Sequence, residues 1–224
     1  LVAVGAFCIG TNQIDLPAAA SAGVAVFNAP YSNTRSVVEL ALGEIITMAR
    51  RLGDKNANMH AGIWDKSANG SHEVRGRTLG IIGYGNIGSQ LSVLAEGLGM
   101  KVYFYDIVDR LALGNATRVY SLQELFERCE TITLHVDGRA SNAHMIGEKE
   151  FSQMRPRTLF LNLCRGNVVD VDALAAALRS GHIAGAAVDV FPGEPASKDE
   201  PFVSPLQGIP NVILTPHVGG STQE

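Results

Sequence analysis

Three polar residues, Arg165, Glu194 and His217, have side chains that could each serve a different role in a single reaction. A histidine can take or give a proton near neutral pH, and a carboxylate on its far ring nitrogen fixes the tautomer. An arginine stays charged and grips a carboxylate in bidentate fashion. Such a trio suits hydride transfer between a 2-hydroxy or 2-oxo acid and a nicotinamide. Taken singly, the three residues fit equally well as an ion-pair partner, a loop residue and a turn histidine.

The position of the trio along the chain makes a shared site plausible. Each member follows a run of apolar residues that is short enough to be a buried strand. In a doubly wound parallel sheet, ligands bind beyond the carboxyl ends of the strands. Other polar or small residues also follow predicted strands: His135, Cys164, Asn167, Asp189, Thr215, Gly219 and Gly220. We therefore expect all of them to gather at one edge of the sheet.

The stretch 79–106 predicts a dinucleotide site. The apolar run 79–82 leads into a G-x-G-x-x-G turn, which reads Gly83-Tyr84-Gly85-Asn86-Ile87-Gly88, and then into a helical pattern. The first glycine allows a tight turn, the second lets the backbone approach a pyrophosphate, and the third lets the helix pack on the strand. The helix N-terminus offers free N–H groups to phosphates. The motif alone is a weak signal, but strand, helix and second strand surround it in the required order.

Asp106 ends the second strand, 101–105, about 20 residues after the glycine turn. Its carboxylate can accept hydrogen bonds from the hydroxyls of a ribose, and it would repel a 2′-phosphate. The sequence therefore predicts NAD rather than NADP as the cofactor.

The rest of the chain predicts an α/β protein. Alternating strands and helices from residue 79 onward favour a doubly wound parallel sheet with right-handed crossovers. We expect helices at 34–51, 56–60, 86–98, 121–127, 148–154 and 171–180, and strands at 79–82, 101–105, 131–136, 158–163, 183–190 and 211–215. A β-α-β unit, 1–27, precedes them, and a turn-rich crossover, 28–33, connects the two parts.

The two ends of the sequence suggest a piece of a longer protein. Residue 1 falls inside a predicted strand. The last residues, with Ser221 or Thr222 as N-cap and Glu224 in the first turn, are typical of a helix start.

Composition excludes several classes of function. The chain has 224 residues, a net charge of −4 and no basic cluster, so we expect neither nucleic acid nor a membrane surface as partner. No apolar run approaches the roughly 18 residues of a membrane span, and no signal peptide is visible. Three scattered cysteines indicate a reducing compartment, and we expect a cytoplasmic protein. No cluster has the spacing of metal ligands.

The single tryptophan, Trp64, lies in a polar segment that contains several glycines. It could pack on its own domain, or it could anchor a partner subunit, since tryptophan is enriched at interface hot spots. Four histidines lack ligand spacing, and we expect them at the surface: His60, His72, His144 and His182.

Several motifs resemble those of the D-isomer-specific 2-hydroxyacid dehydrogenases. They are the runs 79–88, 162–170, 189–195 and 215–220. Within that family, three further segments look like the branch that acts on 3-phosphoglycerate: 5–15, 27–36 and 113–116. The resemblance extends over the whole chain.

The resemblance implies NAD-linked oxidation of 3-phosphoglycerate to 3-phosphohydroxypyruvate, the first step of serine biosynthesis. It implies Arg165 as the carboxylate binder, Glu194 as the residue that orients the histidine, and His217 as the acid/base. It also implies a small-molecule substrate and a homo-oligomer formed through the region 34–70.

Carried over position by position, the resemblance assigns further residues. The cofactor-binding set is Gly83, Tyr84, Gly85, Asn86, Ile87, Gly88, Asp106, His135, Val136, Leu163, Cys164, Arg165, Asp189, His217, Gly219 and Gly220. The substrate set is Ile9, Gly10, Asn33, Arg165 and His217. The implied domains are a Rossmann-like NAD-binding domain, 32–220, after the C-terminal part of a truncated flavodoxin-like substrate domain, 1–31. Residues 221–224 would begin the helix that returns to the substrate domain.

The sequence departs from the usual family pattern at three places. Asp137-Gly138-Arg139 stands where the family usually has a proline, Arg157 replaces a glycine, and Leu163-Cys164 replaces a small pair. These changes concern the fit on the adenine side and the packing near Arg165.

Other functions remain open at this point. One is a different D-2-hydroxyacid dehydrogenase, acting on glycerate, glyoxylate or lactate. Another is a non-enzymatic corepressor-like module that senses NAD(H) and binds peptides, although the intact trio argues against it. A third is a chain that binds NAD but is inactive as a fragment.

Overall fold

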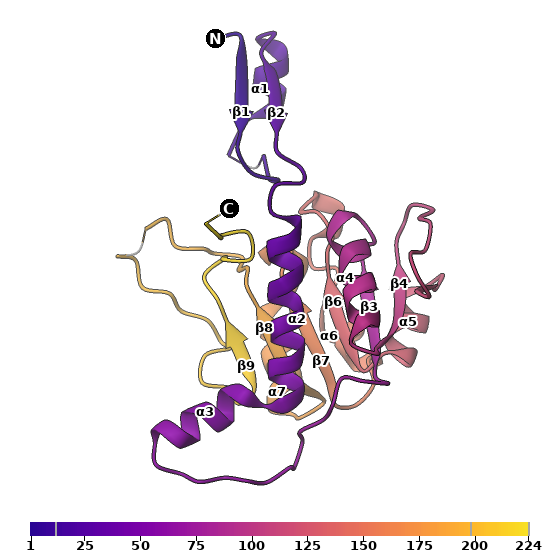
Figure 1. The fold of residues 1–224 in the computed structure, drawn as a ribbon. Coiled ribbons are helices and arrows are strands. Elements are labelled where there is room, and N and C mark those ends of the chain that lie inside the picture. The colour runs from indigo at the N-terminus through magenta and orange to yellow at the C-terminus, as the bar shows by residue number, and fades with distance from the viewer. Residues whose placement is uncertain (12, 198, 224) are drawn as a thin grey trace.

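The computed structural model describes residues 1–11, 13–197 and 199–223, which contain two parallel sheets (Figure 1). The larger sheet has seven strands in the order β5-β4-β3-β6-β7-β8-β9, and every neighbouring pair is parallel. Its strands are β3 (Thr78–Ile82), β4 (Lys101–Tyr105), β5 (Thr117–Arg118), β6 (Thr131–Leu134), β7 (Thr158–Asn162), β8 (Ile183–Val188) and β9 (Val212–Leu214). The predicted doubly wound α/β sheet is confirmed.

The strand order creates a switch point beside β3. From β3 the chain runs outward through β4 to β5, and it then returns to β6 and continues to β9 on the other side. The connecting helices are α4 (Asn86–Gly97), α5 (Leu122–Arg128), α6 (Glu148–Gln153) and α7 (Val171–Arg179). Ligands of such sheets bind beyond the carboxyl ends of the strands at this switch point, which here lies between β3 and β6.

Two apolar layers, one on each face of the sheet, form the core. Ile81 and Leu161 pack with α4 and with the long helix α2 (Thr34–Arg50), whereas Ile82 and Phe160 pack with α5, α6 and α7. Both faces of the sheet are therefore covered. That cover explains why the central strands read as continuous apolar runs rather than as an alternating pattern.

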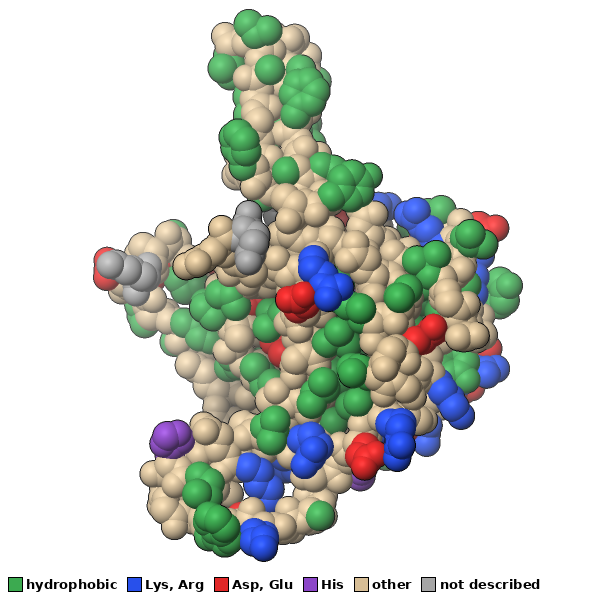
Figure 2. All heavy atoms as spheres, in the orientation of Figure 1, with side chains coloured by type: hydrophobic (Ala, Val, Ile, Leu, Met, Phe, Trp, Pro, Cys, Tyr) green, Lys and Arg blue, Asp and Glu red, His purple; other side chains and the backbone are tan. Residues whose placement is uncertain are grey.

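The N-terminal residues form a separate β-α-β lobe that projects from the main body (Figure 1). It consists of β1 (Ala3–Ala6), α1 (Leu16–Ser21) and β2 (Ala25–Asn28), with β1 and β2 paired in parallel. Asp15 caps α1 by accepting a hydrogen bond from the Ala18 N–H at 2.9 Å. Apolar side chains of the lobe remain exposed, as Figure 2 shows, and Phe7 is 98% accessible.

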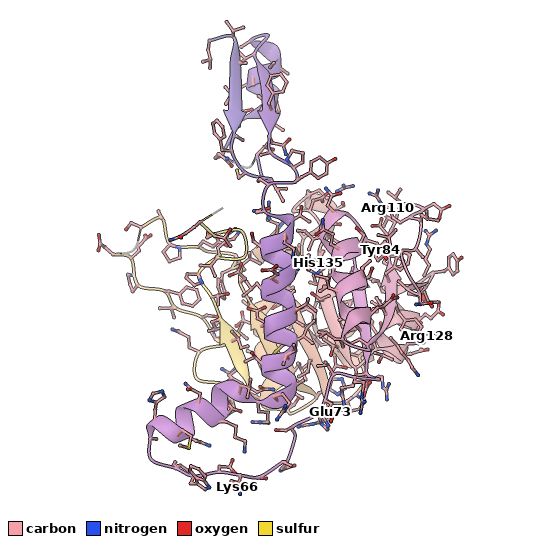
Figure 3. The ribbon with its side chains drawn as sticks, in the orientation of Figure 1. Lys66, Glu73, Tyr84, Arg110, Arg128 and His135 are labelled. Atoms are coloured by element: carbon pink, nitrogen blue, oxygen red, sulfur yellow. The ribbon has the colours of Figure 1, made fainter. Side chains whose placement is uncertain are left out.

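A second projection, which we call the arm, comprises α3 (Leu52–His60) and residues 61–77. It leaves the end of α2 on the side away from the lobe, and Lys66 marks it in Figure 3. Arg51, between α2 and α3, adopts a left-handed backbone conformation with φ of 53°. The arm exposes four large apolar side chains: Leu52, Met59, Ile63 and Trp64. Trp64 is 74% accessible.

Departures from the predicted elements are local. β5 and the 3-10 turns Ala140–Asn142 and Gly166–Val168 are too short to carry a periodic signal in the sequence. His182, which we expect at the surface, is half-buried there, and its Nε2 lies 3.0 Å from the Phe151 carbonyl oxygen.

Two predictions touch residues outside the described ranges, Asn12 in the loop after β1 and Glu224 in the predicted C-terminal helix start. Residues 221–223 form no helical turn, so that helix stays a prediction. No helix in the described part of the chain is long and apolar enough to cross a membrane.

Candidate active site

The glycine turn between β3 and α4 has the geometry of a phosphate cradle. A Cβ atom on Gly83, whose φ is 93°, would lie 2.5 Å from the His135 carbonyl oxygen, and one on Gly88 would overlap the Gly83 carbonyl oxygen. A Cβ on Gly85 would meet only open space. The first and third positions of the turn therefore have no room for a side chain, whereas the second faces open space. That opening, next to the first N–H groups of α4, suits a pyrophosphate.

Asp106 is fixed beside this turn at the end of β4. Its Oδ2 accepts a hydrogen bond from the Tyr84 N–H at 2.7 Å, and its Oδ1 accepts one from the Val108 N–H at 2.8 Å. The Nε atom of Arg110 lies 3.8 Å from Oδ2. Asp106, Arg110 and His135 line a cleft of about 300 Å³, and Figure 3 shows Arg110 and His135 towards the same end of the sheet.

Two members of the glycine motif face away from this cleft. The Tyr84 side chain is buried, stacks on Phe104 with ring centroids 3.7 Å apart, and shares a hydrogen bond with Ser92 at 2.6 Å. Gly88 is buried against β3. Their contribution to a bound dinucleotide would be structural, because they shape the turn rather than line the cleft.

His217 and Glu194 form a pair as the sequence predicts. The Nδ1 atom of His217 lies 2.9 Å from Oε2 of Glu194, while Oε1 of Glu194 accepts a hydrogen bond from the Phe191 N–H at 3.2 Å. The second ring nitrogen, Nε2, has no protein partner among the described residues. A carboxylate on Nδ1 leaves Nε2 as the atom that can exchange a proton.

Arg165 comes from the end of β7. Its Nη1 donates to the Cys164 carbonyl oxygen at 2.6 Å, and its own carbonyl oxygen accepts from the Asn162 side chain at 3.1 Å. Burial raises the pKa of the neighbouring Cys164 thiol to about 11, so that side chain stays uncharged near neutral pH. Beside this uncharged thiol, the guanidinium of Arg165 carries a positive charge at the end of β7. It could therefore hold a substrate carboxylate.

A second cleft, of about 400 Å³, brings together residues from the lobe, α2, the glycine turn and four strand ends. It is lined by these predicted residues: Ile9, Gly10, Asn33, Asn86, Ile87, His135, Val136, Leu163, Cys164, Arg165, Asp189, His217, Gly219 and Gly220. It adjoins the first cleft, with which it shares His135, Val136 and Asp137. Glu194 lies outside it and reaches it only through His217.

Asp189 organises the turn that carries His217. The buried Asp189 carboxylate accepts hydrogen bonds from the Thr215 hydroxyl at 2.5 Å, the Val218 N–H at 2.8 Å and the Gly219 N–H at 2.8 Å. Its carbonyl oxygen accepts from the His217 N–H at 2.8 Å. The backbone of His217 has φ of 54°, a left-handed conformation that is uncommon for residues other than glycine.

His135 lies between the two clefts and is neutral. Burial lowers its pKa to about 4, and its Nε2 lies 3.0 Å from the Thr133 hydroxyl. It is therefore not a second cationic or basic group of the site near neutral pH. Among the described residues, no group of three or more His, Cys, Asp or Glu side chains could hold a metal ion.

Sequence reasoning missed two residues of this region. Arg110 follows a predicted strand, and its position could have revealed it. Glu44 lies within the apolar spacing of α2, and a carboxylate on a buried helix face is a signal that the pattern did contain.

Known proteins give an independent comparison. Residues 42–219 match the family described as D-isomer specific 2-hydroxyacid dehydrogenase, NAD binding domain. The D-3-phosphoglycerate dehydrogenase of Haemophilus influenzae is 58% identical over 224 residues, which are 100% of this chain and 55% of that protein. D-3-phosphoglycerate dehydrogenase 2 of Saccharomyces cerevisiae is 51% identical over 232 residues and is covered to 50%. The chain thus spans about half the length of these curated relatives.

Solved structures agree with the sequence comparison. The D-lactate dehydrogenase of Aquifex aeolicus, complexed with NAD and lactic acid, superposes with a TM-score of 0.89 at 30% identity, over 100% of this chain and 71% of that one. The holo form of Rhodotorula graminis D-mandelate dehydrogenase gives a TM-score of 0.89 at 32% identity, over 99% and 66%. This chain accordingly belongs to the D-isomer specific 2-hydroxyacid dehydrogenase family, and it contains that family's NAD-binding domain.

Proposed function

We propose that the whole protein oxidises 3-phosphoglycerate to 3-phosphohydroxypyruvate with NAD as the hydride acceptor. The observation that carries the proposal is the pair of His217 and Glu194, joined at 2.9 Å, at a cleft that Arg165 also lines. This arrangement supplies an acid/base and a carboxylate binder together. The name of the relatives at 58% identity supports 3-phosphoglycerate as the substrate within the class of 2-hydroxy acids.

The proposed roles follow from the geometry. Arg165 binds the substrate carboxylate and orients the adjacent hydroxyl-bearing carbon. His217, through Nε2, takes the hydroxyl proton while the hydride leaves that carbon for the nicotinamide, and Glu194 stabilises the imidazolium that results. The reverse reaction returns the proton from His217 to the carbonyl oxygen. NAD, when bound, supplies only the hydride-accepting ring.

The residues present fit NAD along the two adjoining clefts. We propose that Gly85, Asn86 and Ile87 bind the pyrophosphate and that Asp106 binds the adenosine ribose. We propose that the cofactor residues of the second cleft lie along the nicotinamide half: His135, Val136, Leu163, Cys164, Arg165, Asp189, His217, Gly219 and Gly220. Gly83, Tyr84 and Gly88 shape the glycine turn, and Ile9, Gly10 and Asn33 approach the substrate from the lobe and the start of α2.

A substrate panel on the whole protein tests the proposal. NAD reduction should be fastest with 3-phosphoglycerate and much slower with glycerate or lactate, and glyoxylate should be a poor acceptor for NADH. His217→Ala should lower kcat by about 10²–10⁴-fold while NAD still binds, because general acid–base catalysis contributes on that order. Unchanged turnover in that variant would contradict the mechanism. Faster turnover of lactate or glyoxylate would still support the proposed reaction class, but it would contradict 3-phosphoglycerate as the substrate.

We also propose an organisation for the whole protein. Residues 1–31 belong to a larger substrate domain, residues 32–220 form the NAD-binding domain, and residues 221–224 begin the helix that returns. The exposed apolar side chains of the lobe support the first assignment. We place the protein in the cytoplasm, because Cys8, Cys129 and Cys164 are free thiols.

The same proposal includes a homo-oligomer formed through the region 34–70, which comprises α2 and most of the arm. Support comes from Trp64, which is 74% accessible, and from the other exposed apolar side chains of the arm.

A further inference from the structure

A buried carboxyl group lies beneath the proposed nicotinamide site and takes no part in the reaction described above. Glu44 occupies the inner face of α2, one turn beyond Leu40 and two turns beyond Val37. The side chains of Leu40 and Val37 lie within 4 Å of where a Cβ of Gly219 would be, so this face of α2 packs against the 215–219 turn. Glu44 is only 4% accessible, and neither of its carboxyl oxygens has a hydrogen-bond partner among the described residues.

Asp189 is the charged group that acts on Glu44. Burial first, and then the negative charge of Asp189, raise the pKa of Glu44 to about 8. The other acids on neighbouring helices have partners elsewhere: Glu96 of α4 accepts from the Asn115 N–H at 2.8 Å, and Asp54 of α3 pairs with Arg51 at 2.6 Å. Strands β7 and β9, which also pack against α2, contain no ionisable side chain.

The two neighbouring carboxyls have unequal surroundings. Asp189 accepts three hydrogen bonds from the 215–219 turn, so its charge is stabilised, whereas Glu44 accepts none within the described residues. Two close carboxylates in a desolvated site do not both ionise easily. The proton of the pair therefore belongs on Glu44, and the charge belongs on Asp189.

We propose that Glu44 is a positioning residue for the NAD site: its neutral form keeps Asp189 as the single buried anion that holds the 215–219 turn and His217. The inference rests on the proposed function, since it assumes that this turn contacts NAD. When Glu44 ionises at alkaline pH, its proton goes to solvent and repulsion pushes the Asp189 carboxylate away from it. That displacement weakens the hydrogen bonds of Asp189 to Val218 and Gly219, and the NAD-facing surface of the turn loses its order.

The test compares Glu44→Gln with Glu39→Gln, a matched change on the exposed face of the same helix, where Glu39 pairs with Arg35 at 2.6 Å. NAD affinity is measured by calorimetry from about pH 6.5 to about pH 9.5, on either side of the Glu44 pKa of about 8. The unaltered protein and Glu39→Gln should lose about tenfold in affinity across this range, which corresponds to about one pKa unit of coupling. Glu44→Gln should bind NAD at neutral pH and show no such loss.

Two outcomes overturn the inference: an affinity of the unaltered protein that does not change with pH, or the same loss in Glu44→Gln as in Glu39→Gln. Failure of the unaltered protein to bind NAD at any pH would instead contradict the proposed function. If Glu44→Gln does not fold, carbon-13 NMR titration of the unaltered protein decides the matter. One glutamate carboxyl must remain protonated at neutral pH, and a spectrum in which every glutamate titrates in the ordinary acidic range overturns the inference.

Discussion

At the residue scale, the strength of the site lies in how Glu194 holds His217. Glu194 uses one oxygen for the Nδ1 atom of His217 and the other for the Phe191 N–H, so the carboxylate cannot rotate freely. In the proposed mechanism a rigid acceptor on Nδ1 matters, because the ring must keep Nε2 aimed at the substrate in both protonation states. The left-handed backbone conformation of His217 costs conformational free energy, which the hydrogen bonds around the turn offset.

Glu194→Gln tests that role. The amide keeps the size of the side chain but loses the negative charge that stabilises the imidazolium, so we expect kcat to fall by about 10²–10⁴-fold. NAD affinity should change little, because Glu194 does not line the cofactor clefts. Steady-state kinetics and calorimetry separate the two effects. Glu200→Gln, in the same loop, serves as control and should retain turnover; an equal loss there would point to a disturbed loop instead.

Asp106 is the residue that we propose to set the preference between NAD and NADP. Asp106→Asn removes the charge that opposes a 2′-phosphate and leaves Arg110 beside the ribose position. We expect NAD affinity to fall by about tenfold, or about 1–2 kcal/mol, and NADP affinity to rise. Titration of the variant with both dinucleotides measures the change. A constant ratio of the two affinities would exclude Asp106 as the discriminating residue.

The raised pKa of Glu44 also predicts how stability varies with pH. Because the folded state holds this proton up to about pH 8 and the unfolded chain releases it near pH 4.5, the folded state binds more protons between these values. The contribution of Glu44 is complete below pH 4.5 and is lost as pH rises to about 8, by up to a few kcal/mol. Urea unfolding of Glu44→Gln should lack this slope. A slope that persists in the variant would assign it to other groups.

At the scale of elements, the sequence predicted helices and strands best where the apolar spacing and the positions of glycines indicated the same limits. The helix 34–51 and the strands around the glycine turn were predicted almost to the residue, because apolar spacing and glycines mark their limits. The trio was found from residue type and position together, since each member has a suitable side chain and follows a predicted strand. β5 pairs only two residues and has no detectable pattern. The proximity of Glu44 to Asp189 could not be predicted either, because it depends on how α2 lies across the sheet.

The packing of α4 on β3 depends on Gly88. A methyl group there would overlap the Gly83 carbonyl oxygen and come within 3.0 Å of Ile81, so Gly88→Ala should lower the free energy of unfolding by about 3 kcal/mol or more. Gly97→Ala, in the same helix with open space around it, should instead be neutral or stabilise by up to about 1 kcal/mol. Urea denaturation compares the two. Equal effects would mean that helix propensity, rather than contact with β3, governs both.

At the scale of the whole molecule, the lobe and the arm leave opposite ends of α2, and both expose apolar side chains (Figures 1 and 2). The site lies at the lobe end. Contacts that the arm makes with a second copy would therefore lie away from the reacting atoms, so assembly and chemistry could be altered separately.

Trp64→Ala tests the proposed assembly. Loss of an exposed indole at an interface should weaken self-association by about 2 kcal/mol or more, or about 30-fold in the dissociation constant. Analytical ultracentrifugation over a range of protein concentrations measures it, with Lys66→Ala on the same arm as control. A monomeric unaltered protein, or equal association in both variants, would remove Trp64 from the interface.

Arg51 and Arg157 are positions at which the stability of the folded protein can be raised. Both adopt left-handed backbone conformations, with φ of 53° and 72°, and both line cavities at the ends of the strands remote from the reacting groups. A left-handed conformation costs a side-chain-bearing residue about 1–2 kcal/mol, and glycine accepts it at the expense of some chain entropy. Glycine at position 157 should therefore leave a net gain of about 0.5–1 kcal/mol. Engineering for heat resistance can begin at this edge while catalytic function is left as it is.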